Sequence, residues 1–69
     1  MKKHPIFAER LIQSTDDKGL KAGWIAARLE VSNASMTKWR AGAVLPGPHN
    51  LFALAKLLGV KASWLAGVV

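Results

Sequence analysis

The chain contains no cysteine, so disulfide bridges and thiolate zinc sites are excluded, as is common for proteins of a reducing cytoplasm. It also lacks a long hydrophobic run. Its longest stretch without Lys, Arg, Asp or Glu, residues 41–55, is interrupted by glycines and prolines and is shorter than the ~20 apolar residues of a membrane span. Glu9 and Arg10 break the apolar stretch that a signal peptide would need. We therefore expect a soluble, cytoplasmic protein.

Acidic residues are scarce as well. Four Asp and Glu against ten Lys and Arg give a net charge of +6 over 69 residues. This charge attracts a polyanion, either nucleic acid or an anionic membrane. The length predicts a single domain, residues 1–69, with a small core and a short mobile basic arm at residues 1–4.

No group of residues indicates catalysis. The serines have no His and acid beside them in a credible triad, and His4 and His49 are too isolated for a metal site. We predict a protein that is not an enzyme and uses no cofactor, metal or small-molecule ligand.

Hydrophobic periodicity and helix-end signals predict an all-α fold of five helices with no strand. Pro5 and Pro48 suit first helical positions, and glycines suit the helix ends. The expected helices run from residue 5 to between 14 and 18, then over 21–29, from 33 to just before Gly42, over 48–58 and over 62–66.

The centre of the chain, residues 25–42, predicts two short helices joined by a tight turn. Ile25, Ala26 and Leu29 share one helical face, and Met36 and Trp39 repeat that spacing after the interruption. Between the two helices, Ser32 is a natural N-cap and Val31 can fill the angle. This is the pattern of a helix-turn-helix.

The outer face of the second of these helices is short, polar and basic. It contains Asn33, Ala34, Thr37 and Lys38, with Arg40 or Ala41 at its end. Such side chains can read base edges in a DNA major groove. The same residue types are also common on an ordinary solvated helix, so this face alone does not decide its function.

The order of these segments resembles the lambda-repressor-like, or XRE-type, DNA-binding domain, and most closely the repressor and Cro proteins of lambdoid phages. The resemblance rests on LKAGWIAARLEVSNASMTKWRAG, then Pro46, then NLFALAKLLGV and SWLAG, across about fifty residues. It implies base contacts from Ser32, Asn33, Ala34, Thr37 and Lys38. It implies phosphate contacts at the starts of the second and fourth helices, from Lys21, Ala22, Gly47, His49 and Asn50.

The chain departs from the family pattern at several positions. Ala22 stands where the family usually has a phosphate-binding glutamine, so only its backbone can make that contact. Glu30 replaces the usual turn glycine, at a position expected to need a positive φ.

A buried Arg–Glu pair that is common in the family is absent. The matching residues are Thr15 and Arg40, and losing both partners of a buried pair can be nearly neutral. We expect Arg40 to turn outward, either to a DNA phosphate or to Asp16 or Asp17.

The aromatic residues carry separate expectations. Trp39 should be in the core, and Trp64 and Phe52 should also be packing residues. Trp24 is expected to be partly exposed, because Ile25 and Ala26 already occupy the core face. It could cover the first helix, contact a neighbouring subunit or lie near the DNA backbone.

These observations predict a sequence-specific DNA-binding protein, a bacterial or prophage transcriptional repressor that binds a palindromic operator as a homodimer in the nucleoid. The chain would be one domain of a larger repressor, or a Cro-like protein that dimerises through Trp64, Leu65, Val68 and Val69. One alternative is an interaction module such as an antitoxin, which an exposed apolar patch near Trp24 or the C-terminus would favour. The other is a cationic membrane-surface protein.

Overall fold

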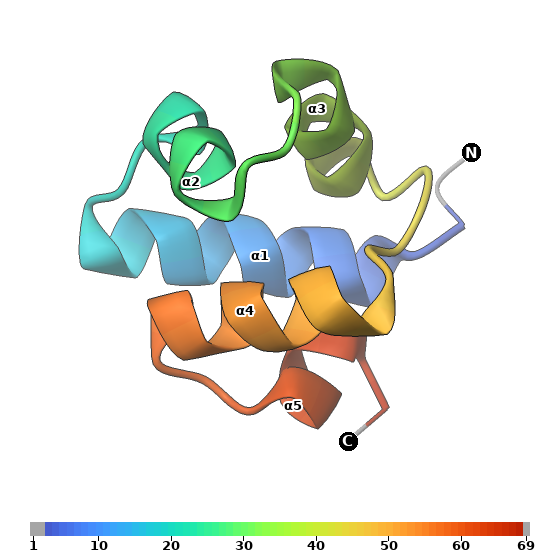
Figure 1. Ribbon diagram of the computed structural model, residues 1–69. Coiled ribbons are helices and arrows are strands. Elements are labelled where there is room, and N and C mark those ends of the chain that lie inside the picture. Colours follow the sequence, from blue (N-terminus) through green and yellow to red (C-terminus); the bar gives the residue numbers. More distant parts are fainter. Residues whose placement is uncertain (1–2, 69) are drawn as a thin grey trace.

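The computed structural model describes residues 3–68, which form five α-helices (Figure 1). Within this range there is no strand, which confirms the all-α, five-helix prediction. The helices are α1 (Pro5–Lys18), α2 (Ala22–Leu29), α3 (Asn33–Ala41), α4 (Pro48–Leu58) and α5 (Ala62–Ala66). The predicted bounds hold except that α2 begins one residue later than expected.

Local signals explain where the helices begin and end. Pro5 and Pro48 occupy first helical positions, where the missing N–H costs nothing. Glu30, the residue after α2, has a φ of 57°, which confirms the predicted left-handed turn at a non-glycine residue. Gly42 ends α3 with a φ of 73°, and a Cβ atom there would lie 2.9 Å from the carbonyl oxygen of His4. Only glycine fits that position without displacing the chain.

The helices are arranged around α1. Helices α3, α4 and α5 pack against α1, and α2 packs against α3 and α4 (Figure 1). Their inward faces form one hydrophobic core, to which every helix contributes: Phe7, Leu11, Ile25, Ala26, Met36, Trp39, Leu54, Ala55, Leu58 and Leu65. Burial of each large apolar side chain stabilises the fold by about 1.5–3 kcal/mol before the entropy cost. None of the helices within residues 3–68 is long and apolar enough to cross a membrane.

The N-terminal arm forms backbone hydrogen bonds at residues 3 and 4. The backbone amides of Lys3 and His4 donate to the carbonyl oxygen of Gly42, at 3.0 and 2.9 Å. This oxygen is free to accept because α3 has ended and no intrahelical donor reaches it. Met1 and Lys2 lie outside the described residues, and the mobile arm at residues 1–4 stays a prediction.

The aromatic residues divide into three groups. Trp39 is 4% exposed and belongs to the core, as predicted. Trp64 is half-buried, with the Arg10 guanidinium 4.7 Å from its ring centre and donating to its carbonyl oxygen. Phe52 is 67% exposed, so its predicted packing role is wrong. The helix turns by about 100° per residue, which places Phe52 to one side of the buried stripe of Leu54, Ala55 and Leu58.

Candidate nucleic-acid interface

Helices α2 and α3 are joined by a turn of three residues, Glu30 to Ser32. The amide of Val31 donates to the carbonyl oxygen of Ala26 at 3.0 Å, and the Val31 side chain packs against the core. Ile25 and Ala26 of α2 and Met36 of α3 are buried in the same cluster. This shared core and the short turn fix α3 relative to α2.

The start of α3 is capped by its own side chain. The amide of Ser35 donates to the Ser32 hydroxyl oxygen at 3.1 Å, as predicted for an N-cap. The Ser32 hydroxyl also donates to the Ser35 hydroxyl at 3.1 Å. The O–H group of Ser32 therefore already donates within the protein. Toward a ligand, the Ser32 oxygen can only accept one more hydrogen bond.

The outer face of α3 is open to solvent. The five residues predicted to read bases are all exposed, and they follow one another along this face: Ser32, Asn33, Ala34, Thr37 and Lys38. The Thr37 hydroxyl donates to the carbonyl oxygen of Asn33 at 3.0 Å, so toward a ligand its oxygen acts as an acceptor. The Asn33 side chain has both an amide donor and a carbonyl acceptor to offer.

The starts of α2 and α4 differ from that of α3, because neither has a side-chain cap. At α2 the first amides belong to Ala22, which is half-buried, and to Gly23, around which a Cβ atom would meet nothing within 4 Å. At α4 the first residue is Pro48, so the first available amides are those of His49 and Asn50. Such uncapped amides, at the positive end of the helix dipole, can bind an anion.

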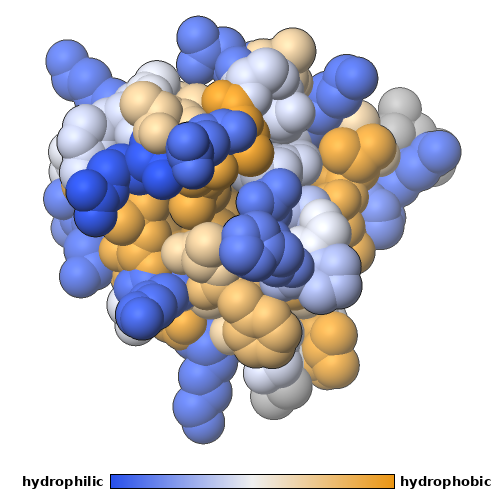
Figure 2. All heavy atoms as spheres, in the orientation of Figure 1, coloured by the Kyte–Doolittle hydropathy of each residue, from blue (hydrophilic) through white to orange (hydrophobic). Residues whose placement is uncertain are grey.

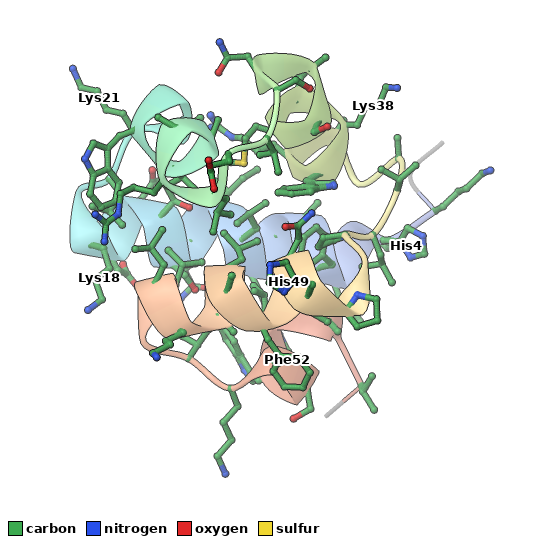
Figure 3. All side chains as sticks on the ribbon, viewed as in Figure 1. His4, Lys18, Lys21, Lys38, His49 and Phe52 are labelled. Atoms are coloured by element: carbon green, nitrogen blue, oxygen red, sulfur yellow. The ribbon has the colours of Figure 1, made fainter. Side chains whose placement is uncertain are left out.

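The predicted contact residues lie on α2, α3 and α4 or directly before one of these helices. Lys21, just before α2, and Lys38 of α3 project from the same side of the molecule, away from α4 and α5 (Figure 3). His49 lies on α4 and faces the viewer. Gly47 and His49 are exposed and Asn50 is half-buried.

Arg40 is exposed near the C-terminal end of α3, as predicted. That end is tied to the start of α1 by the hydrogen bonds of Lys3 and His4. Asp16 and Asp17 lie at the opposite end of α1, about 18 Å away at 1.5 Å per helical residue. The predicted alternative of an ion pair with either aspartate is therefore wrong, and the phosphate alternative stays a prediction.

Thr15, which the family resemblance matched with Arg40, is buried. Its hydroxyl donates to the carbonyl oxygen of Leu11 at 2.6 Å. The polar group is thus satisfied within α1 and needs no partner from α3.

Most acidic side chains lie on α1, and none lies on α3. Three of the four, Glu9, Asp16 and Asp17, line an open hollow on the outer side of α1, together with Pro5, Ile12 and Gln13. The fourth, Glu30, lies in the turn before α3, and α3 itself contains no acidic residue. The outer face of α3 therefore has Lys38 and Arg40 as its only charged residues.

Trp24 is 45% exposed, which confirms its predicted partial exposure. The Arg28 guanidinium lies 5.5 Å from its ring centre, one turn along α2. One face of the ring is thus covered by a cation of the same helix, and the rest is open at the start of α2.

The residues predicted to form a dimer contact do not form one exposed surface. Leu65 is buried in the core and Trp64 is half-buried beneath Arg10. Val68 is 79% exposed, and Val69 lies outside the described residues. The prediction is wrong for Leu65, because α5 turns this side chain toward α1 and α4.

Across residues 3–68, His, Asp and Glu side chains do not gather in threes that could hold a metal ion. Comparison with known proteins adds no relative, since the chain matches no protein-family model, no curated protein sequence and no solved structure.

Proposed function

We propose that this chain binds double-stranded DNA sequence-specifically, as a bacterial or prophage transcriptional regulator that represses its target. In this proposal α2 and α3 are the helix-turn-helix of a lambda-repressor-like domain, and α3 enters the major groove. The observation that supports this proposal is that α3 has one buried face and one exposed face. Met36 and Trp39 anchor one face in the core, while a short, polar, basic face without an acidic residue is left open.

The exposed side chains match the chemistry of base edges. The Asn33 amide can pair with the N6 and N7 atoms of adenine, and Ala34 can contact a thymine methyl group. Because the Thr37 hydroxyl already donates within α3, it would accept from an adenine or cytosine amino group. Lys38 can reach guanine or a phosphate. Ser32 would contribute less to base reading, since its hydroxyl is used in the cap.

The uncapped helix starts and the basic residues would position the domain on the backbone. Amides at the starts of α2 and α4 can donate to phosphate oxygens, with Lys21, His49 and Asn50 beside them. Arg40 would contact a phosphate at the other end of α3. The net charge of +6 would add long-range attraction to DNA.

A reader of this size contacts few base pairs, so we propose that two copies bind a palindromic site. Recognition helices of such dimers enter successive major grooves about 34 Å apart. Two half-sites read together would provide the specificity that one short helix lacks.

Selection from a random duplex pool tests the function. The expected result is one enriched, two-fold symmetric sequence that is bound far more tightly than unrelated DNA across a salt series. If no sequence is enriched and all binding disappears with added salt, α3 presents only a basic surface and the proposal fails.

A protein-interaction module such as an antitoxin is the second candidate, and the exposed Trp24 favours it. An antitoxin would also bind DNA, so the distinguishing result is a toxin partner whose binding is lost in Trp24→Ala while DNA binding remains. Binding to anionic vesicles in preference to duplex DNA would instead favour the membrane-surface alternative.

A further inference from the structure

The outer face of α1 is the largest helix face that the fold leaves uncovered. Glu9, Ile12 and Asp16 lie on successive turns of this face and line the open hollow described above. The face is opposite to Phe7 and Leu11, which are buried in the core. Within residues 3–68, the helices that pack against α1 therefore meet its buried side and leave the outer side open.

This hollow contains most of the negative charge of a basic protein. Three of the four acidic residues line it, and none of the described residues that line it is basic. The rest of the chain has ten Lys and Arg but only one acidic residue, Glu30. The side chains of Glu9, Asp16 and Asp17 are exposed. The hollow therefore attracts a positively charged partner and repels DNA phosphates.

The spacing of the carboxylates fits a chain segment and not a metal ion. Within residues 3–68, acidic and histidine side chains do not gather in threes that could hold a metal. Glu9 and Asp16 are separated by two helical turns, which is about 10.5 Å along the axis. The half-buried Ile12 lies between them, one turn from each. A matching partner has two positive side chains about 10 Å apart with an apolar side chain between them.

Apolar surface elsewhere on the molecule does not identify a partner. Apolar atoms lie open on the side seen in Figure 2, and Phe52, which Figure 3 labels on that side, is 67% exposed. Any apolar surface could cover such a side chain, because the hydrophobic effect is not directional. The outer face of α1 is different, since its charge specifies the sign of the partner's charge.

We propose that the outer face of α1 binds a basic segment of another protein, in which Lys or Arg residues flank an apolar residue. The basic side chains pair with Glu9 and Asp16, and the apolar side chain packs on Ile12. Each exposed ion pair contributes little, so binding depends on the pairs and the apolar contact together. This inference goes beyond the proposed DNA binding and does not rest on it.

Selection from a library of short random peptides, with the wild-type protein as the target, is the first test. We expect enriched peptides with Lys or Arg on both sides of Leu, Ile or Phe. A synthetic copy of one enriched peptide is then titrated by fluorescence anisotropy. Replacement of its central apolar residue by serine should weaken binding about 10-fold. No enrichment, or enrichment of peptides without basic residues, overturns the inference.

Two protein variants locate the binding surface. Glu9→Gln and Asp16→Asn each remove one carboxylate of the hollow and should weaken binding of the synthetic peptide about 2- to 5-fold. Glu30→Gln is the matched control, because it removes an exposed carboxylate outside the hollow, and it should bind as wild type does. Circular dichroism should show that all three variants are as helical as wild type. Equal peptide affinities for wild type, Glu9→Gln and Asp16→Asn would overturn the inference.

A second copy of this basic chain is the other occupant that the hollow could attract. Sedimentation of the free protein, without peptide or DNA, distinguishes the two. We expect no self-association that depends on the Glu9 carboxylate. A concentration-dependent dimer that Glu9→Gln weakens would show that the hollow pairs two copies, and it would overturn the assignment to another protein.

Discussion

The inner face of α3 contains Met36 and Trp39, which are 2% and 4% exposed, whereas Asn33, Thr37 and Lys38 on the outer face are all open to solvent. The inner residues hold the helix against α1 and α2. The outer residues make no contact that the fold needs, apart from the hydrogen bond of Thr37 within its own helix. Substitutions on the inner face should therefore change stability, and those on the outer face should change only ligand binding.

Trp39→Ala should have the largest effect. Removal of a buried tryptophan costs about 3–5 kcal/mol, which is comparable to the whole stability of a domain this small. We expect the helical circular-dichroism signal to be largely lost at 25 °C. Trp24→Ala, at the exposed tryptophan, serves as the control and should remain folded. Equal urea midpoints for wild type and Trp39→Ala would contradict the assigned core role.

Asn33→Ala should affect DNA binding alone. Loss of a bidentate contact to adenine costs about 1–3 kcal/mol of discrimination, while the free energy of unfolding should change little at this exposed position. Titration of the selected duplex and of the same duplex with one base pair changed measures the loss. An unchanged preference between the two duplexes would remove Asn33 from the base-reading set.

Ser32 caps α3 and is also among the residues proposed to contact DNA, so two substitutions separate these roles. Ser32→Ala removes the cap of α3 and should lower the free energy of unfolding by about 0.5–2 kcal/mol. Ser32→Asp keeps a capping oxygen and should retain stability, but its carboxylate should weaken DNA binding by repelling phosphates. Thermal unfolding and duplex titration of both variants provide the two readouts. If Ser32→Asp binds as tightly as wild type, Ser32 does not approach the DNA.

Arg40→Ala should have the smallest effect. Loss of one phosphate contact lowers the slope of log affinity against log salt by about 0.9 and weakens binding to all sequences alike. Lys56→Ala, an exposed cation of α4, is the charge-matched control and should leave the slope nearer to that of wild type. An identical slope for wild type and Arg40→Ala would rule out the phosphate contact.

The helix bounds were predictable because their signals are local. Pro48 begins α4, Ser32 caps α3 and Gly59 follows α4, and each acts through its own backbone or its nearest neighbours. The positive φ of Glu30 was expected only through the family resemblance, in which a glycine is usual at this turn position. The exposure of the outer face of α3 also followed from spacing alone, once Met36 and Trp39 were assigned to the core.

The errors concern contacts between residues far apart in the chain. The hydrogen bonds of Lys3 and His4 to Gly42, nearly forty residues later, were not predicted, because no local signal in the arm indicates them. Phe52 was predicted to be a packing residue, although its position about 100° from Leu51 was a signal that it lies off the buried stripe. Leu65 was assigned to a dimer contact, but α5 packs it into the core.

The sequence by itself therefore determined the five helices, their ends and the polar face of α3, because capping, backbone conformation and helical periodicity act within a few residues. Only the tertiary structure decided which apolar side chains are covered. Burial depends on which helices meet, and five short helices do not offer enough surface to enclose Trp24 and Phe52 as well as the core.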